Sequence, residues 1–421
     1  MVAAKKRAPL LSRIVDRVRR RTKSVLKLIT YKCILPLLYR WWSRKPIDEK
    51  LVLFADHRDR PTPDNFLPMI ELCEKNGYRC VVLSGRPFSD KLPRWTRRPA
   101  KVKFQFQFVK LLARSRALFL YDGFPLAFVV QPRPETTVVQ LWHGCGAMKM
   151  FGYSTLDKAW RGVTKLYPAH NIYALACVSG PKAVGPFEEA FRSKPGVVQA
   201  IGCPRTDVYF DQKARAAMGK KLRKKFPQLQ GKRVVLYAPT FRGNSIAKSH
   251  MKLNLVFRQI LAQLPDDYVF LVKLHPLTAK SDGISELDRI ACPGRLFDVS
   301  KTLTAEEALC AADILIADYS SILFEYLLLE RPIISYIYDI DEYIRDRGLY
   351  FPYEQLSPGP YVSTQEELVE KLRTVDEWFD IERTRRYKEE WMSACDGHST
   401  QRVFEAVFGA APGSGKGEGE S

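Results

Sequence analysis

Short apolar runs rich in β-branched and aromatic residues alternate with helix-like stretches along most of the chain. The runs cover residues 51–55, 80–83, 117–121, 137–142 and 173–178 in the first half, and residues 234–237, 268–273, 314–317 and 333–336 in the second. Continuous apolar runs of this length predict strands that are buried on both faces. Their alternation with helices is typical of βαβ units and a parallel sheet.

The two series of strands are separated by a polar, Lys-rich helical stretch, residues 207–232. We therefore predict an α/β protein with two doubly wound, Rossmann-like domains, the N-terminal one at residues 47–230 and the C-terminal one at residues 231–408. The last helical stretch, residues 364–408, is long enough to cross back over the first domain. Residues 409–421 are rich in Gly, Ser and Glu and are expected to be disordered.

The segment before the first strand, residues 1–46, has a different pattern. Apolar residues recur at helical spacing between arginines and lysines over residues 11–29, which predicts a basic amphipathic helix. The apolar stretch that follows is interrupted by Lys32, Pro36 and Arg40, so it falls short of the roughly 20 residues that a bilayer crossing needs. Trp41 and Trp42 suit the headgroup level of a membrane. We expect this arm to lie on a membrane and not to cross it.

Charge supports that interpretation of the arm. The 421 residues carry a net charge of +21, and the first 45 hold 14 Lys or Arg and one acidic residue. The predicted partner is an anionic membrane surface, at the cytoplasmic face. A nucleic-acid-binding arm, or a helix packed on its own domain with a solvated basic face, are the alternatives. The 9 cysteines form no C-x-x-C pair, which indicates reduced thiols in the cytoplasm.

Ligands of open parallel sheets collect at the carboxyl ends of the strands. At the first such place His143 follows a predicted strand and precedes Gly144, and its imidazole suits a general base. Hydrogen bonding within the turn is the structural alternative. Lys149, a few residues later, is either a phosphate contact or a solvated charge.

Two further places follow strands of the second domain. At one, Thr240 offers a hydroxyl and Arg242 a planar fork that matches phosphate oxygens. At the other, strand alternation puts Lys273 and His275 on one face, where both could donate to an anion. The structural alternative is that Lys273 is an ordinary charge at a strand edge and His275 an ordinary turn residue. We give this alternative and anion binding about equal weight.

The fourth place has an apolar strand running into Asp318, Ser320 and Ser321 and then an apolar helix. Unpaired backbone N–H groups at that helix start would cradle a diphosphate, whereas a simple N-cap would need only one hydroxyl. Asp339 and Asp341 have the D-x-D pattern that holds metal in some nucleotide-sugar enzymes. We favour a carboxylate that caps the helix or binds a hydroxyl, because nearby cations could neutralise a diphosphate without a metal.

Together these stretches resemble the CDP-glycerol glycerophosphotransferase family of teichoic-acid polymer synthesis. The matching residues are 140–144 (Gln-Leu-Trp-His-Gly), 237–242 (Tyr-Ala-Pro-Thr-Phe-Arg), 273–276 (Lys-Leu-His-Pro), 318–322 (Asp-Tyr-Ser-Ser-Ile) and the run from 331 to 350. The similarity covers residues 137–360, and the number and order of the motifs make it specific. The chain departs from the family at Cys145, Gly146, Ala147 and Met148, where the family usually has Thr-Pro-Leu, so the loop beside the proposed base is altered.

The resemblance implies the two-domain GT-B arrangement, with CDP-glycerol in the C-terminal domain, acceptor chemistry at the cleft and peripheral attachment to the cytoplasmic membrane face. It also implies that His143 is the base and that Arg242, His275, Asp318, Ser320 and Ser321 lie in the donor site. The complete candidate site has His143 as the catalytic residue, no metal and no cofactor, and nine substrate-binding or donor-binding residues: Lys149, Thr240, Arg242, Lys273, His275, Asp318, Ser320, Ser321 and Asp339.

The predicted reaction transfers glycerol phosphate from CDP-glycerol to a hydroxyl of a lipid-linked or polyol-phosphate acceptor and releases CMP. One rival on the same fold uses another donor, CDP-ribitol or a nucleotide-sugar. Another is a basic nucleic-acid-binding protein, which the concentration of charge in one arm and the lack of an aromatic-rich motif disfavour. A catalytically silent scaffold is the third. The sequence assigns no oligomeric state.

Overall fold

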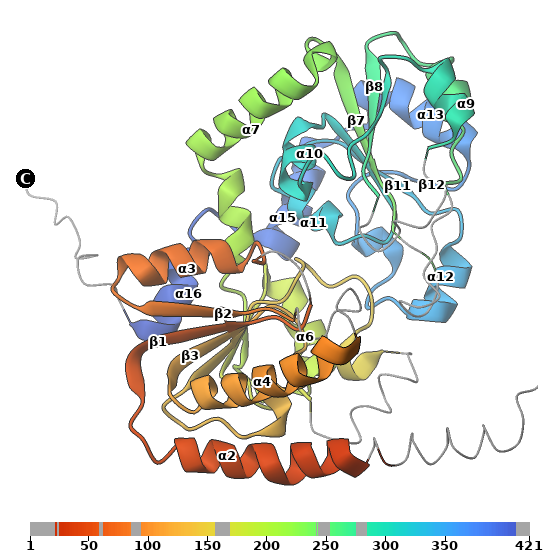
Figure 1. Ribbon diagram of the computed structural model, residues 1–421. Coiled ribbons are helices and arrows are strands. Elements are labelled where there is room, and N and C mark those ends of the chain that lie inside the picture. The colour runs from red at the N-terminus through yellow and green to blue at the C-terminus, as the bar shows by residue number, and fades with distance from the viewer. Residues whose placement is uncertain are drawn as a thin grey trace, which may run out of the picture.

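The computed structural model describes residues 22, 25–58, 62–85, 94–155, 169–240, 242, 253–274 and 284–409, with the side chains of 94–98 left out. Two parallel sheets form two lobes, one above the other in Figure 1. The predicted α/β fold with two parallel-sheet domains is therefore confirmed.

The first sheet has the strand order β2-β1-β3-β4-β5-β6, and every pairing in it is parallel. Its strands are β1 (Asp48–Ala55), β2 (Arg79–Leu83), β3 (Ser115–Leu120), β4 (Thr137–Gln140), β5 (Leu175–Cys177) and β6 (Val198–Gln199). Five of them coincide with predicted strands, and the short edge strand β6 was not predicted because two residues give no apolar run.

Helices cover both faces of this sheet. Val52 and Phe54 of β1 pack with α3 (Phe66–Lys75) and α16 (Ser399–Phe408), whereas Leu53 and Ala55 face the opposite layer. That layer contains α4 (Arg94–Leu112), α6 (Val184–Phe191) and, outside α4, the helix α2 (Leu35–Trp42). Burial on both faces explains why the strands are apolar at successive positions.

The second sheet has the order β12-β11-β10-β7-β8-β9 and is also entirely parallel. Its strands are β7 (Arg233–Ala238), β8 (Tyr268–Val272), β9 (Leu296–Asp298), β10 (Ile314–Ala317), β11 (Ile333–Tyr336) and β12 (Tyr361–Val362), of which β9 and β12 were not predicted. Its helices are α8 (Phe257–Leu261), α9 (Glu286–Ala291), α10 (Ala305–Ala311), α11 (Ile322–Leu327), α12 (Ile340–Arg347), α13 (Gln365–Arg373) and α14 (Val375–Trp378).

Two segments join the lobes. Helix α7 (Gln212–Lys225) leads from the first sheet to the second, at the left of Figure 1. The chain then returns through α15 (Ile381–Met392) to α16, which packs against α3. The predicted return over the first domain is thus made by α16. One buried apolar cluster continues from the first lobe into the second, so the lobes share a core.

The N-terminal segment packs on the first lobe through one side of α2. Leu35 is 0% and Tyr39 6% exposed, whereas Leu37 is 62% and Trp41 57% exposed. A π-helical turn, Thr30–Ile34, precedes α2 and Pro36. The arginine-rich part of the predicted arm, residues 1–21, and the predicted tail, residues 410–421, lie outside the described residues. Within the described segments, no helix has the length and apolarity needed to cross a membrane.

Candidate active site

The loop of residues 141–146 follows β4, contains the proposed base His143 and is called the base-bearing loop below. It is held by buried polar groups. The Oε1 atom of Gln140 accepts a hydrogen bond from the Trp142 amide at 2.9 Å, and Nδ2 of Asn65 donates to the Trp142 carbonyl at 2.8 Å. Trp142 has a φ of +59°, a conformation that a bulky residue adopts only when its surroundings impose it. Its ring packs against Phe151 and Phe191. The loop that presents His143 is therefore rigidly placed.

His143 is paired with a carboxylate from the neighbouring strand. Nδ1 of His143 lies 3.5 Å from Oδ1 of Asp122, which lies two residues after the end of β3. The other oxygen of Asp122 is 2.7 Å from the Arg58 guanidinium, and the Gly123 amide donates to Oδ1 at 2.8 Å. Burial disfavours the charged form, but His143 and Arg58 outweigh it and hold the pKa of the Asp122 carboxyl well below its usual range.

An ionised Asp122 determines what His143 can do. A carboxylate facing Nδ1 favours the tautomer with the proton on that nitrogen, which leaves Nε2 as the proton acceptor. The His143 side chain is 41% exposed, so the ring is accessible to an acceptor hydroxyl. Asp122 follows the predicted strand 117–121, so the strand-end rule that selected His143 could have found it.

Several residues predicted to bind the CDP-activated donor form a cluster at the carboxyl ends of β7 and β10. Arg242 donates from Nη1 to Asp318 at 2.8 Å and from Nη2 to Asp339 at 3.0 Å. Asp318 also accepts from the Thr240 amide at 2.9 Å, and the hydroxyl of Tyr319 donates to Asp339 at 3.1 Å. These strands flank the position where the strand order reverses, which is where such sheets bind ligands.

Arg242 is paired with two carboxylates. Its side chain is 12% exposed, and burial, which opposes its charge, is outweighed by Asp318 and Asp339, so the pKa of the guanidinium is raised. Its guanidinium also lies over the ring of Tyr319. This ring stacks on that of Tyr343, with 3.7 Å between the ring centroids. The Thr240 hydroxyl, in contrast, has no hydrogen-bond partner within the described part of the chain.

Lys149 reaches the same cluster from the first lobe. Its backbone bridges to Leu349, and the amide of Tyr350 donates to the Met148 carbonyl at 3.0 Å. Burial lowers the pKa of the half-buried Lys149 ammonium to about 8, against the attraction of Asp318. Lys149 therefore adds a positive charge to this cluster, in which the charge of Arg242 is already paired with carboxylates.

Ser320 and Ser321 precede α11, and Ser321 approaches the loop that contains His143. The Ser320 hydroxyl accepts from the Ile322 amide at 3.4 Å, and Ser321 is the N-cap residue without a side-chain capping bond. A Cβ atom on Gly144 would lie 2.9 Å from the Ser321 hydroxyl oxygen. The glycine after His143 thus permits the close approach of the two lobes.

The remaining predicted residues lie apart from this cluster or outside the described chain. Nζ of Lys273 donates to the Leu303 carbonyl at 2.7 Å, and burial lowers the pKa of this lysine. His275 lies outside the described residues. Asp341 is in the first turn of α12, and the described residues hold no group of three side chains suited to a metal.

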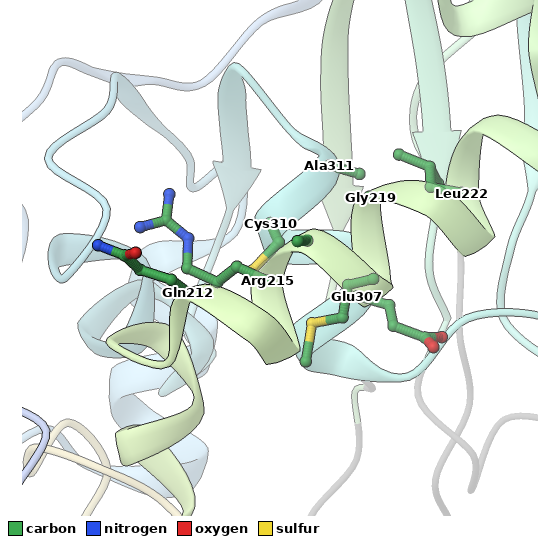
Figure 2. A pocket seen from close by; sticks show the side chains of 9 residues that line it. Gln212, Arg215, Gly219, Leu222, Glu307, Cys310 and Ala311 are labelled. Carbon is green, nitrogen blue, oxygen red and sulfur yellow. The ribbon is translucent and has the colours of Figure 1, made fainter.

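Three cavities among the described residues contain none of the predicted site residues. Figure 2 shows one of about 350 Å³ between α7 and α10, lined by Gln212, Arg215 and Cys310 among others. A larger one of about 760 Å³ borders Arg205, a residue that the sequence analysis did not select.

The chain is similar to known proteins over most of its length. Residues 37–409 match the family model described as CDP-Glycerol:Poly(glycerophosphate) glycerophosphotransferase. The chain is 31% identical over 366 residues to the teichoic acid ribitol-phosphate primase of Bacillus spizizenii, covering 86% of this chain and 92% of the primase. It is 30% identical over 309 residues to the teichoic acid glycerol-phosphate primase of Bacillus subtilis, covering 71% of this chain and 75% of that protein.

Longer relatives are matched over only part of their length. The chain covers 47% of the teichoic acid poly(ribitol-phosphate) polymerase of Bacillus spizizenii, at 32% identity over 70% of this chain.

The solved structure of the wall teichoic acid polymerase TagF has the same fold, with a TM-score of 0.70 at 20% identity over 95% of this chain and 98% of that one. The family model matched to nearly the whole chain and the identity to the primases establish that this protein belongs to the CDP-glycerol:poly(glycerophosphate) glycerophosphotransferase family.

Proposed function

We propose that the protein transfers a polyol phosphate, glycerol phosphate first, from its CDP-activated form to a hydroxyl of a membrane-linked acceptor in teichoic-acid-like polymer synthesis. Family membership supports the donor class. The observation that carries the proposal is the pairing of His143 with Asp122, next to Gly144, whose backbone closely approaches Ser321 of the second lobe.

The reaction is an in-line displacement at the β-phosphorus of the donor. The acceptor oxygen forms a bond to that phosphorus while its proton passes to Nε2 of His143, and the bond to the bridging oxygen breaks to release CMP. Asp122 stabilises the imidazolium that forms. Lys149, the Thr240 hydroxyl and the amides around Ser320 and Ser321 are proposed to balance charge on the diphosphate.

Arg242 has a modified role in this proposal. Because Asp318 and Asp339 occupy its fork, we propose that it holds both carboxylates in place and leaves neutralisation of the diphosphate to other groups. The carboxylates would then be available to the hydroxyls of the donor.

CDP-ribitol is the second candidate donor, favoured by the 31% identity to a ribitol-phosphate primase that this chain covers to 92%. The test is nucleotide release, CMP from CDP-glycerol or CDP-ribitol and UDP from a UDP-sugar, each with a disaccharide-lipid or polyol-phosphate acceptor. We expect acceptor-dependent release from one CDP-polyol, lost in His143→Ala and kept in the control His398→Ala, whose side chain is exposed. Release only from a UDP-sugar would overturn the donor class.

We also propose peripheral attachment to the cytoplasmic face of an anionic membrane through residues 1–46. Exposed Leu37 and Trp41 beside Arg40 support this, because they offer apolar surface next to positive charge. Deleting residues 1–24 together with Leu37→Ser and Trp41→Ser should abolish sedimentation with anionic vesicles and leave turnover of a soluble acceptor intact, because Leu35 and Tyr39, which pack on the first lobe, are kept. Equal sedimentation of this variant would refute the attachment.

A further inference from the structure

Arg205 is a buried guanidinium that lies between the two halves of the site. It belongs to the 3-10 turn Pro204–Tyr209, and its side chain is 9% exposed. Nη1 donates to the backbone carbonyl of His143 at 3.1 Å. Nη2 lies 3.3 Å from carboxylate oxygens of both Glu325 and Glu306 and 3.2 Å from Asp64.

The backbone of Arg205 supports the same loop by a second route. Its amide donates to Oδ1 of Asn65 at 2.8 Å, and Nδ2 of Asn65 donates to the Trp142 carbonyl at 2.8 Å. Two successive carbonyls of the base-bearing loop, those of Trp142 and His143, are therefore held by one connected network. This network helps to impose the positive φ of Trp142.

Two of the three carboxylates around Arg205, those of Glu325 and Glu306, belong to the second lobe. Glu325 lies on α11, the helix that starts directly after Ser321, and its side chain is 4% exposed. It also accepts a hydrogen bond from the Tyr209 hydroxyl at 3.1 Å. Glu306 lies in the first turn of α10. The same guanidinium therefore contacts the loop with the base and the helix that begins at the donor site.

We propose that Arg205 is a positioning residue that fixes the His143 loop relative to α11 and so sets the distance between the base and the bound donor. The proposal rests on the proposed function. Arg205 acts through the backbone of His143 and through Glu325 and touches no reacting atom. Placement matters because a shift of about 1 Å in a catalytic group can lower a rate about 10²-fold.

The main test is Arg205→Lys. Lysine keeps the positive charge opposite three carboxylates, but its single ammonium lacks the fork that reaches a carbonyl and carboxylates together. We expect kcat to fall about 10-fold to 10²-fold while the equilibrium affinity for the CDP-polyol stays within about 3-fold. Amide hydrogen exchange in residues 140–146 should become faster.

The matched control is Arg295→Lys. Arg295 also joins a carboxylate, Asp266, to backbone carbonyls, those of Leu264 and Pro265, but at the amino end of the second sheet. We expect unchanged kcat and unchanged exchange in residues 140–146. A second test variant, Arg205→Met with Glu325→Gln, removes the guanidinium together with one buried charge and should reproduce the loss of kcat.

Several results would overturn the role of Arg205. They are a kcat within about 3-fold of wild type in both variants, a donor affinity that falls as much as kcat, or unchanged exchange in the loop. Failure of the proposed function gives a different result, because the wild-type protein would then release no CMP from any donor. The exchange measurement tests the positioning of the loop even in that case.

Discussion

The His143 side chain, which pairs with the single carboxylate of Asp122, is 41% exposed. The Arg242 side chain, which pairs with both Asp318 and Asp339, is only 12% exposed. One carboxylate on an imidazole orients the ring and leaves a nitrogen free for proton transfer. Two carboxylates on a guanidinium use up its donors. We therefore propose that the same kind of ion pair prepares a reactive group in the first lobe and builds a rigid binding surface in the second.

This difference predicts that the two regions fail in different ways. Changes around His143 should lower turnover and leave stability nearly unchanged, because the ring is exposed. Changes around Arg242 should lower stability and donor affinity together, because its loss leaves two largely buried carboxylates without their cation.

The largest expected effect is that of His143→Ala. Removing a general base costs about 10² to 10⁴ in rate, so kcat for CMP release should fall in that range. The melting temperature should stay within about 2 °C of wild type, since a surface substitution changes stability little. Near-normal turnover in this variant would remove His143 from the mechanism.

Arg242→Met should have the next largest effect, and mainly on stability. Breaking a buried ion pair by removing one partner costs about 3 to 5 kcal/mol, which chemical denaturation can measure. The control is Arg233→Met, since Arg233 pairs with Asp376, which is 79% exposed, and such a pair contributes about 0 to 1 kcal/mol. Equal losses in the two variants would contradict the distinction between the regions.

Asp122→Asn should lower kcat by roughly 10²-fold, because an amide can no longer stabilise an imidazolium or enforce the tautomer. Donor affinity, measured by calorimetry, should stay near wild type. The contrast with Arg242→Met is the point of the measurement. A variant that loses donor binding but keeps kcat would reverse the assignment of the two regions.

Lys149 predicts a pH dependence at the boundary between the regions. Its pKa is lowered to about 8, so the ammonium is present below that pH and is lost as the pH rises through it. The KM for the donor should therefore increase above about pH 8 by several-fold. Lys149→Arg, which stays charged, should shift this increase to higher pH, whereas an unchanged profile would exclude Lys149 from donor binding.

Gly144→Ala should have the smallest effect, about 2-fold in kcat/KM, because the added Cβ meets the Ser321 hydroxyl at 2.9 Å and displaces that side chain slightly. The control is Gly185→Ala in α6, where a Cβ meets nothing within 4 Å. If both variants behave alike, the close approach of Gly144 and Ser321 has no role in turnover.

Much of the fold could be predicted from apolar runs, because a strand buried on both faces must be apolar at successive positions. The edge strands β6, β9 and β12 escaped prediction, since two or three residues give no such run. The strand-end rule selected His143, Thr240 and Asp318, which the structure places at the ends of β4, β7 and β10.

Partners across the chain could not be predicted. Asp122 precedes His143 by only 21 positions, yet their pairing depends on β3 lying next to β4. Arg205 and Glu325 are 120 positions apart and meet only because two domains close on each other. Nothing in the local sequence of either residue marks such a contact.

By itself, the sequence determined which residue types follow each strand, the two-domain α/β architecture and the family. These depend on local patterns of polarity and on motifs that the chain carries in order. Only the tertiary structure decided that the charge of Arg242 is paired with two carboxylates, that Asp122 pairs with His143 and that Arg205 contacts both lobes. The reason is physical, because charge pairing acts over a few ångströms in space, and packing of strands and domains determines which charges come within that distance.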